Sequence, residues 1–159
     1  MASWLSHSNQ KLYQARLLLD TLEQAESSET AVADMVSALQ ESVIFQLVLA
    51  YQSYLHELAE IAQCRDSFMS LSQLVELTPV PTGEMKEFSK LESDSFSWLS
   101  QLLTAFEHCS DKDPAVNKAP LKAEMIQLYD TTSTSLPLRD WYEALINIID
   151  LQRDNRQES

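Results

Sequence analysis

One short stretch places metal-binding side chains at helical spacing: His56-Glu57-Leu58-Ala59-Glu60. On a helix, His56 and Glu60 are four residues apart and share a face, with Glu57 beside them. A zinc-protease helix has the pattern His-Glu-x-x-His, in which two imidazoles bind zinc and the glutamate acts as a base. Here Glu60 replaces the second histidine, so a further ligand would have to come from elsewhere. We therefore prefer a solvated His/Glu pair and keep His56, Glu57 and Glu60 as a weak metal-site hypothesis.

Other catalytic patterns are missing from the sequence. Neither His56 nor His108 follows a glutamate at the spacing of a di-iron Glu-x-x-His pair, and no serine sits in a Gly-x-Ser-x-Gly turn. The single glycine, Gly83, leaves no glycine-rich loop to bind phosphate groups. The sequence thus predicts no enzyme, no catalytic residue and no cofactor.

The element that would position these side chains is a long helix at about residues 31–63, which contains no glycine or proline. Its apolar residues recur at steps of 3 and 4, close to the ~3.6 residues of a helical turn. That row consists of Val32, Val36, Leu39, Val43, Leu47, Ala50, Tyr54, Leu58 and Ile61. Residues 43–51 are apolar almost all round, which is typical of a helix surrounded by neighbours. We expect this helix to be the central rod of the fold.

The remaining sequence favours shorter helices around the rod. We expect them at about residues 8–26, 68–77, 84–106 and from 137 onward, with a break of the third at residues 93–97 left open. Apolar rows define a buried face in the first (Leu12, Ala15, Leu19, Leu22) and the last (Leu138, Trp141, Leu145, Ile148, Leu151). Loops are predicted near residues 78–83 and 110–120, a frayed tail from about 154, and residues 121–135 fit either helix or irregular structure. The fold class is therefore all-α: one antiparallel helical bundle of about five helices, spanning residues 1–159.

Charge narrows the range of partners. The chain has 24 acidic and 11 basic residues, giving a net charge of −13. Such a chain repels nucleic acid and anionic membranes, so we expect a protein partner or a second copy of the chain. Because a small bundle leaves part of an all-round apolar rod uncovered, Val43, Leu47, Tyr51 and Tyr54 are the predicted interface. With no secretory signal and no run of eighteen apolar residues, we expect a cytoplasmic protein without a transmembrane span.

Four segments carry a family resemblance: NQKLYQARLLL (9–19), LVLAYQSYLHELAEIA (47–62), SWLSQLL (97–103) and RDWYEALINIIDLQR (139–153). In this order they resemble an uncharacterised family of short, all-helical bacterial proteins, labelled PasA-like, with a domain of unknown function. The resemblance implies a bacterial, cytoplasmic helical protein and assigns no catalytic residue. A broader similarity is to HEPN-type helical bundles, which often dimerise. Their ribonuclease members place a histidine at a short fixed spacing after an arginine, and no arginine here has that spacing.

Three hypotheses follow. The first is a non-enzymatic interaction module, a homodimer with an acidic surface that docks a protein partner. The second is a HEPN-like accessory or toxin–antitoxin component without the ribonuclease motif. The third is a metal- or ligand-binding bundle around His56.

Overall fold

The computed structural model describes residues 3–111 and 136–158, and these form six helices and no strand. The helices are α1 (Trp4–Ser27), α2 (Ala33–Ile61), α3 (Leu71–Leu77), α4 (Gly83–Ser93), α5 (Trp98–His108) and α8 (Leu138–Glu158). The all-α class is confirmed, with one helix more than the predicted five among the described residues. The predicted loop at 110–120, apart from its first two residues, and the ambiguous segment 121–135 lie outside these ranges.

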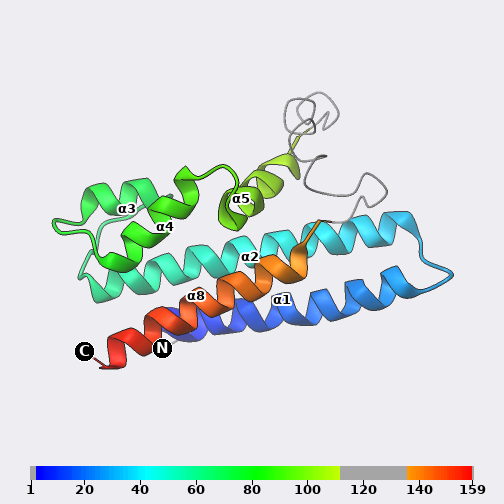
Figure 1. The fold of residues 1–159 in the computed structure, drawn as a ribbon, viewed down its shortest axis with the longest axis horizontal. Helices are drawn as coiled ribbons and strands as arrows, with labels where there is room; N and C mark the ends of the chain where they lie inside the picture. The colour runs from blue at the N-terminus through cyan, green and yellow to red at the C-terminus, as the bar shows by residue number, and fades with distance from the viewer. Residues whose placement is uncertain (1–2, 112–135, 159) are drawn as a thin grey trace.

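Helices α1 and α2 form a long hairpin (Figure 1), in which they lie side by side and run in opposite directions. Helix α8 crosses this hairpin, and α3, α4 and α5 pack along the C-terminal half of α2 (Figure 1). The prediction that α2 is the central rod is confirmed by its position, since it contacts α1, α5 and α8.

Capping residues explain where several helices begin. Ser3 accepts a hydrogen bond from the backbone N–H of Ser6 at 3.1 Å, so α1 starts before the predicted Ser8 and includes Trp4. Ser97 caps α5 in the same way, and therefore the break after α4 lies at residues 94–97. Such side-chain oxygens satisfy backbone donors that have no partner in the first helical turn. Helix α2 begins without a side-chain cap.

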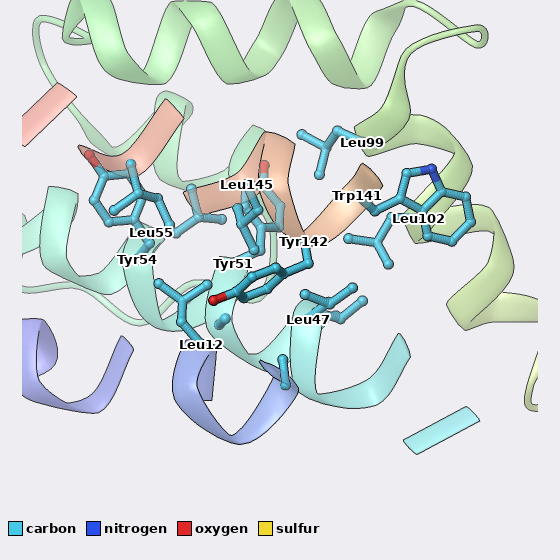
Figure 2. Close-up of a cluster of buried hydrophobic side chains, with 14 of the residues drawn as sticks. Leu12, Leu47, Tyr51, Tyr54, Leu55, Leu99, Leu102, Trp141, Tyr142 and Leu145 are labelled. Atoms are coloured by element: carbon cyan, nitrogen blue, oxygen red, sulfur yellow. The ribbon is translucent and has the colours of Figure 1, made fainter. Parts of the chain in front are cut away.

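The core lies where α1, α2, α5 and α8 meet (Figure 2). Its largest fully buried side chains include Tyr54 and Trp141, and the ring of Phe88 packs 5.8 Å from that of Tyr54. The predicted face of α1 is confirmed, because Leu12, Ala15, Leu19 and Leu22 are all buried. Burying aromatic and leucine side chains of this size supplies most of the driving force for folding.

Helix α8 differs from its prediction in two ways. Its buried row passes through Ile149 and Gln152, while Leu151 is 58% exposed and Ile148 only partly buried. Its regular structure continues to Glu158, where the sequence predicted a frayed tail from about residue 154. The arginine contacts described below explain why the last turns remain helical.

Helix α2 contains no unbroken run of eighteen apolar residues, but by length and composition alone it is apolar enough to cross a membrane. The same criterion is met by core helices of proteins that never enter a membrane. Residues 43–59 of α2 include twelve buried side chains, Ser53 and Glu57 among them. The criterion therefore assigns no location to the protein.

Candidate functional site

Glu57, near the C-terminal end of α2, is a charged side chain in the interior, with only 6% of its surface exposed. Arg153 of α8 grips its carboxylate with two hydrogen bonds: Nε donates to Oε1 at 3.1 Å and Nη2 to Oε2 at 2.8 Å. Arg156, one turn further along α8, places Nη2 at 3.4 Å from Oε1. Two parallel bonds from one guanidinium fix the relative orientation of the two helices as well as neutralising the charge.

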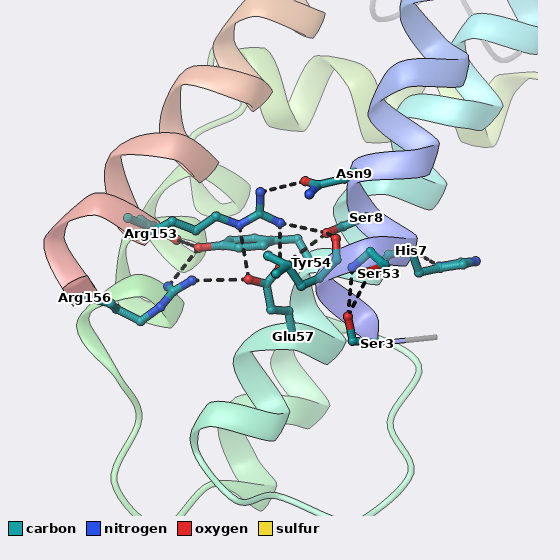
Figure 3. A network of polar contacts seen from close by, with 12 residues as sticks. Ser3, His7, Ser8, Asn9, Ser53, Tyr54, Glu57, Arg153 and Arg156 are labelled. Atoms are coloured by element: carbon teal, nitrogen blue, oxygen red, sulfur yellow. Dashed lines mark hydrogen bonds and ion pairs between the residues drawn. The ribbon is translucent and has the colours of Figure 1, made fainter. Parts of the chain in front are cut away.

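Each arginine also reaches a second helix (Figure 3). Arg153 donates to Oδ1 of Asn9 at 2.7 Å and to Oγ of Ser8 at 2.9 Å, both on α1. Arg156 donates to Oε2 of Glu84 on α4 at 3.0 Å. The two arginines therefore connect α8 with α1, α2 and α4 at once. We call Ser8, Asn9, Tyr54, Glu57, Glu84, Gln152, Arg153 and Arg156 the Glu57 cluster.

Tyr54 forms the floor of this cluster. Its hydroxyl accepts a hydrogen bond from Arg156 at 3.1 Å and donates one to Oε1 of Gln152 at 2.7 Å. Burial raises the pKa of Tyr54 to about 12, although Arg156 acts in the opposite direction. The phenol is thus protonated at neutral pH and serves as a hydrogen-bonding group. Gln152 is 3% exposed, and its Nε2 has no partner within the described residues.

The helical period explains how polar residues come to be inside. The buried row of α8 runs through Trp141, Leu145, Ile149 and Gln152 to Arg156 at steps of 4, 4, 3 and 4. Its core-facing side therefore changes from apolar to polar near the C-terminus. A buried charge is tolerated only when it is paired and hydrogen-bonded, and Glu57 meets both conditions. In chemical terms, the two arginines balance the charges of Glu57 and Glu84, and the cluster joins α8 to three other helices.

The residues of the metal hypothesis are separated by the fold. The ring of His56 stacks on Trp4 at 4.2 Å and lies 4.4 Å from the ring of Phe68, whereas Glu57 turns toward α8. Glu60 is exposed. Within residues 3–111 and 136–158, no group of three or more His, Cys, Asp and Glu side chains is arranged to hold a metal ion. The structure gives the metal hypothesis no support.

His56 instead joins the first turn of α1 to the segment before α3. Burial lowers the pKa of His56, and His7 acts in the same direction while Glu60 opposes it. His7 lies close by, with Nδ1 2.9 Å from Oγ of Ser53 (Figure 3). Its ring also makes an edge contact with that of Trp4. A neutral imidazole between two aromatic rings is a packing element.

The predicted interface requires a correction. Val43, Leu47, Tyr51 and Tyr54 are each no more than 2% exposed, because α1, α4, α5 and α8 cover them. Figure 2 shows three of them inside the core, surrounded by residues of these helices. The apolar rod is covered by its own chain, so these side chains cannot meet a partner in the folded protein. The phenol of Tyr51 also has an internal partner, the Oε2 of Glu92 at 3.1 Å.

Sequence reasoning missed Arg153 and Arg156 because it assigned them to the frayed tail. The signal was present in the sequence: Gln152 and Arg156 continue the core row of α8, and Glu57 follows Tyr54 by three residues on the core side of α2. A polar residue that falls on a core row predicts a buried partner elsewhere in the chain. The sequence alone does not indicate which partner.

These contacts define an all-helical protein whose first and last helices are joined through a buried charge cluster on the central helix. The chain belongs to the family of unknown function DUF6586, whose model matches residues 1–159. This agrees with the resemblance to an uncharacterised family; the PasA-like label and the bacterial origin stay predictions. Searches of the curated proteins and of the solved structures found no match.

Proposed function

We propose that this protein is a non-enzymatic interaction module that binds a positively charged protein segment through the tip of its α1–α2 hairpin. We define the hairpin tip as residues 20–41, the end of α1, the connection and the start of α2. The observation that carries the proposal is the gathering of exposed acidic and exposed apolar side chains there.

The hairpin tip is uniformly acidic. All six of its charged residues are exposed acids, namely Asp20, Glu23, Glu26, Glu29, Asp34 and Glu41. No lysine or arginine occurs between Arg16 and Arg65 in the sequence. Within the described residues, Arg139 is the cation that contacts the tip, through Asp20 and Glu23. A field of one sign attracts an oppositely charged partner and speeds its association.

Apolar side chains lie among these acids. Val32 and Met35 are 62% and 57% exposed at the beginning of α2. Figure 1 shows that the hairpin extends past the start of α8, which leaves this end away from the core. Methionine adapts to varied partners, and interfaces combine apolar contacts with a charged rim. A basic amphipathic helix has the matching chemistry, with apolar residues for Val32 and Met35 and cations for the surrounding acids.

The test is site-specific photo-crosslinking in the source cell, with a photoreactive residue at Met35 and a matched control at Met69. Met69 is 86% exposed but lies in the segment between α2 and α3, away from the tip. We expect a distinct crosslinked protein from position 35 that position 69 does not give. That protein is then purified and its affinity for the full chain measured.

Two charge-matched double variants complete the test. Glu26→Gln with Glu29→Gln neutralises two acids of the tip, and Glu60→Gln with Glu76→Gln neutralises two exposed acids elsewhere. We expect the first pair to weaken binding about tenfold and to flatten its salt dependence, and the second to leave both nearly unchanged. Equal affinities for the two double variants, or identical crosslinks from positions 35 and 69, would contradict the proposal.

Other features of the proposal follow from charge. A net charge of −13 disfavours nucleic acid and anionic lipid as partners, in keeping with a cytoplasmic protein that binds a basic protein segment. A HEPN-like accessory role is the alternative from the sequence. No contact among the described residues specifically favours it, and the arginine–histidine spacing of the ribonucleases is missing.

A further inference from the structure

A groove lies between α8 and the α4–α5 pair. Its volume is about 470 Å³. Helix α4 supplies Glu87, Lys90 and Leu91, helix α5 supplies Trp98, and helix α8 supplies Ala144, Asn147, Ile148 and Leu151.

The groove gives α8 a second apolar face. Ala144, Ile148 and Leu151 follow one another at steps of 4 and 3 and therefore share a side of the helix, next to the buried row of Leu145 and Ile149. Leu151 is 58% exposed, while Ile148, Leu91 and Trp98 are partly buried against the core. The sequence predicted Ile148 and Leu151 as core residues because both are apolar and lie at helical spacing. Among the described residues, however, no helix covers this side of α8.

The charges at this groove are of both signs, unlike those of the hairpin tip. Glu87 and Lys90 stand on its α4 wall with opposite signs, and neither forms an ion pair within the described residues. Nearby, Lys86 on α4 adds a positive charge, and Asp150 and Asp154 on α8 add negative ones. A surface that carries both signs side by side can pair with itself, whereas two copies approaching by the acidic hairpin tips would repel each other.

We infer that this groove is the docking site for a second copy of the chain, in a two-fold symmetric dimer. A two-fold interface brings the same patch of both subunits together, so it needs a patch that complements itself. Leu151 projects beside a hollow of about 470 Å³ and enters the groove of the other copy. Lys90 of each subunit then lies opposite Glu87 of the other. A basic partner would bind the acidic hairpin tip, whereas a second copy of the chain binds the groove.

Sedimentation equilibrium of the full chain tests the inference. We expect a concentration-dependent dimer whose dissociation constant rises at least about tenfold in Leu151→Glu, because the charge is carried into an apolar groove. The matched control is Met69→Glu, an exposed apolar residue outside the groove, which should dimerise as the original chain does. Since Leu151 is exposed, the variant should fold, and an unchanged thermal midpoint confirms that it has.

A charge exchange tests the symmetric arrangement. Lys90→Glu and Glu87→Lys should each weaken the dimer, and the double variant should restore it, since each charge again meets its opposite across the axis. A chain that stays monomeric overturns the inference, as does a dimer indifferent to Leu151→Glu. A double variant as weak as the single ones overturns the Lys90–Glu87 pairing. None of these outcomes depends on the hairpin tip, so this inference and the proposed function fail separately.

Discussion

The two ends of α8 are both tied to the α1–α2 hairpin by arginine–carboxylate contacts, yet in different surroundings. At its start, Arg139 meets Asp20 and Glu23, and the three side chains are 32%, 53% and 49% exposed. At its end, Arg153 and Arg156 contact Glu57, and the exposed fractions of these three side chains are 15%, 22% and 8%. The two sets of contacts use the same chemical groups and differ in how much of each side chain is exposed to solvent.

This difference separates two roles for charge. Exposed ion pairs are screened by salt and add little to stability, so the acids of the hairpin tip stay available to a partner. A buried carboxylate costs a large desolvation energy, and losing its cations leaves that cost without compensation. The Glu57 cluster therefore selects how α8 docks, and the hairpin tip presents charge to the surroundings.

The largest effect should come from breaking the buried end. Glu57→Ala leaves Arg153 and Arg156 without their shared carboxylate, and we expect a loss of about 2–4 kcal/mol in the free energy of unfolding. Urea denaturation monitored by circular dichroism measures it. Glu60→Ala removes an exposed acid one turn away on the same helix and should cost less than about 0.5 kcal/mol. Similar losses in both variants would show that burial does not distinguish the two acids.

Truncation of α8 tests the same contacts by removing the arginines instead of Glu57. Removing residues 153–159 deletes both arginines and should cost about 1–3 kcal/mol, because the Glu57 carboxylate then regains only water. Removing residues 157–159 leaves Arg153 and Arg156 in place and should change little. Thermal unfolding of the two truncated chains makes the comparison. If the longer truncation is as stable as the shorter, the end of α8 is the frayed tail that the sequence predicted.

The tail predicted from about residue 154 shows what periodicity can and cannot predict. Spacing predicted the buried row of α1 because a face depends on residues three and four apart in one segment. On α8 it favoured Ile148 where Ile149 is buried, since neighbouring isoleucines fit rows that differ by one residue. The Glu57 cluster joins Asn9, Glu57 and Arg153, which are far apart in sequence. No local pattern encodes such a pairing, and only the packing of α8 across the hairpin brings these side chains together.

The exposed end should respond weakly and with a dependence on salt. Arg139→Ala should lower the free energy of unfolding by about 0.2–1 kcal/mol at low ionic strength, and most of this loss should disappear in high salt. A small part of this loss in free energy should persist in high salt, because the Arg139 guanidinium also lies over the ring of Tyr142, 5.9 Å from its centroid. Arg65→Ala, an exposed arginine outside the described ion pairs, controls for the change in net charge. A salt-independent loss as large as that of Glu57→Ala would remove the contrast between the two ends.

Glu92 provides the intermediate case, a partly buried acid whose partner is a hydroxyl and not a guanidinium. Burial raises the pKa of Glu92, although the hydrogen bond donated by Tyr51 acts against the shift. A carboxyl whose pKa is raised by folding contributes full stability below its unfolded pKa and loses it as the pH rises through the folded value. Glu92→Gln keeps an acceptor for Tyr51 without the charge, so we expect a gain of about 1–2 °C in Tm at neutral pH.

The pH dependence of that gain decides its cause. It should vanish in acid below the usual glutamate pKa of 4.5, where Glu92 is itself neutral in both the folded and the unfolded chain. Differential scanning calorimetry across this range measures it, with Glu76→Gln, an exposed acid on α3, as the control. A variant that is less stable at neutral pH would mean that the Glu92 carboxylate is stabilised in place, as Glu57 is by its arginines. A tyrosine hydroxyl would then stabilise a partly buried carboxylate in this fold, as a guanidinium does.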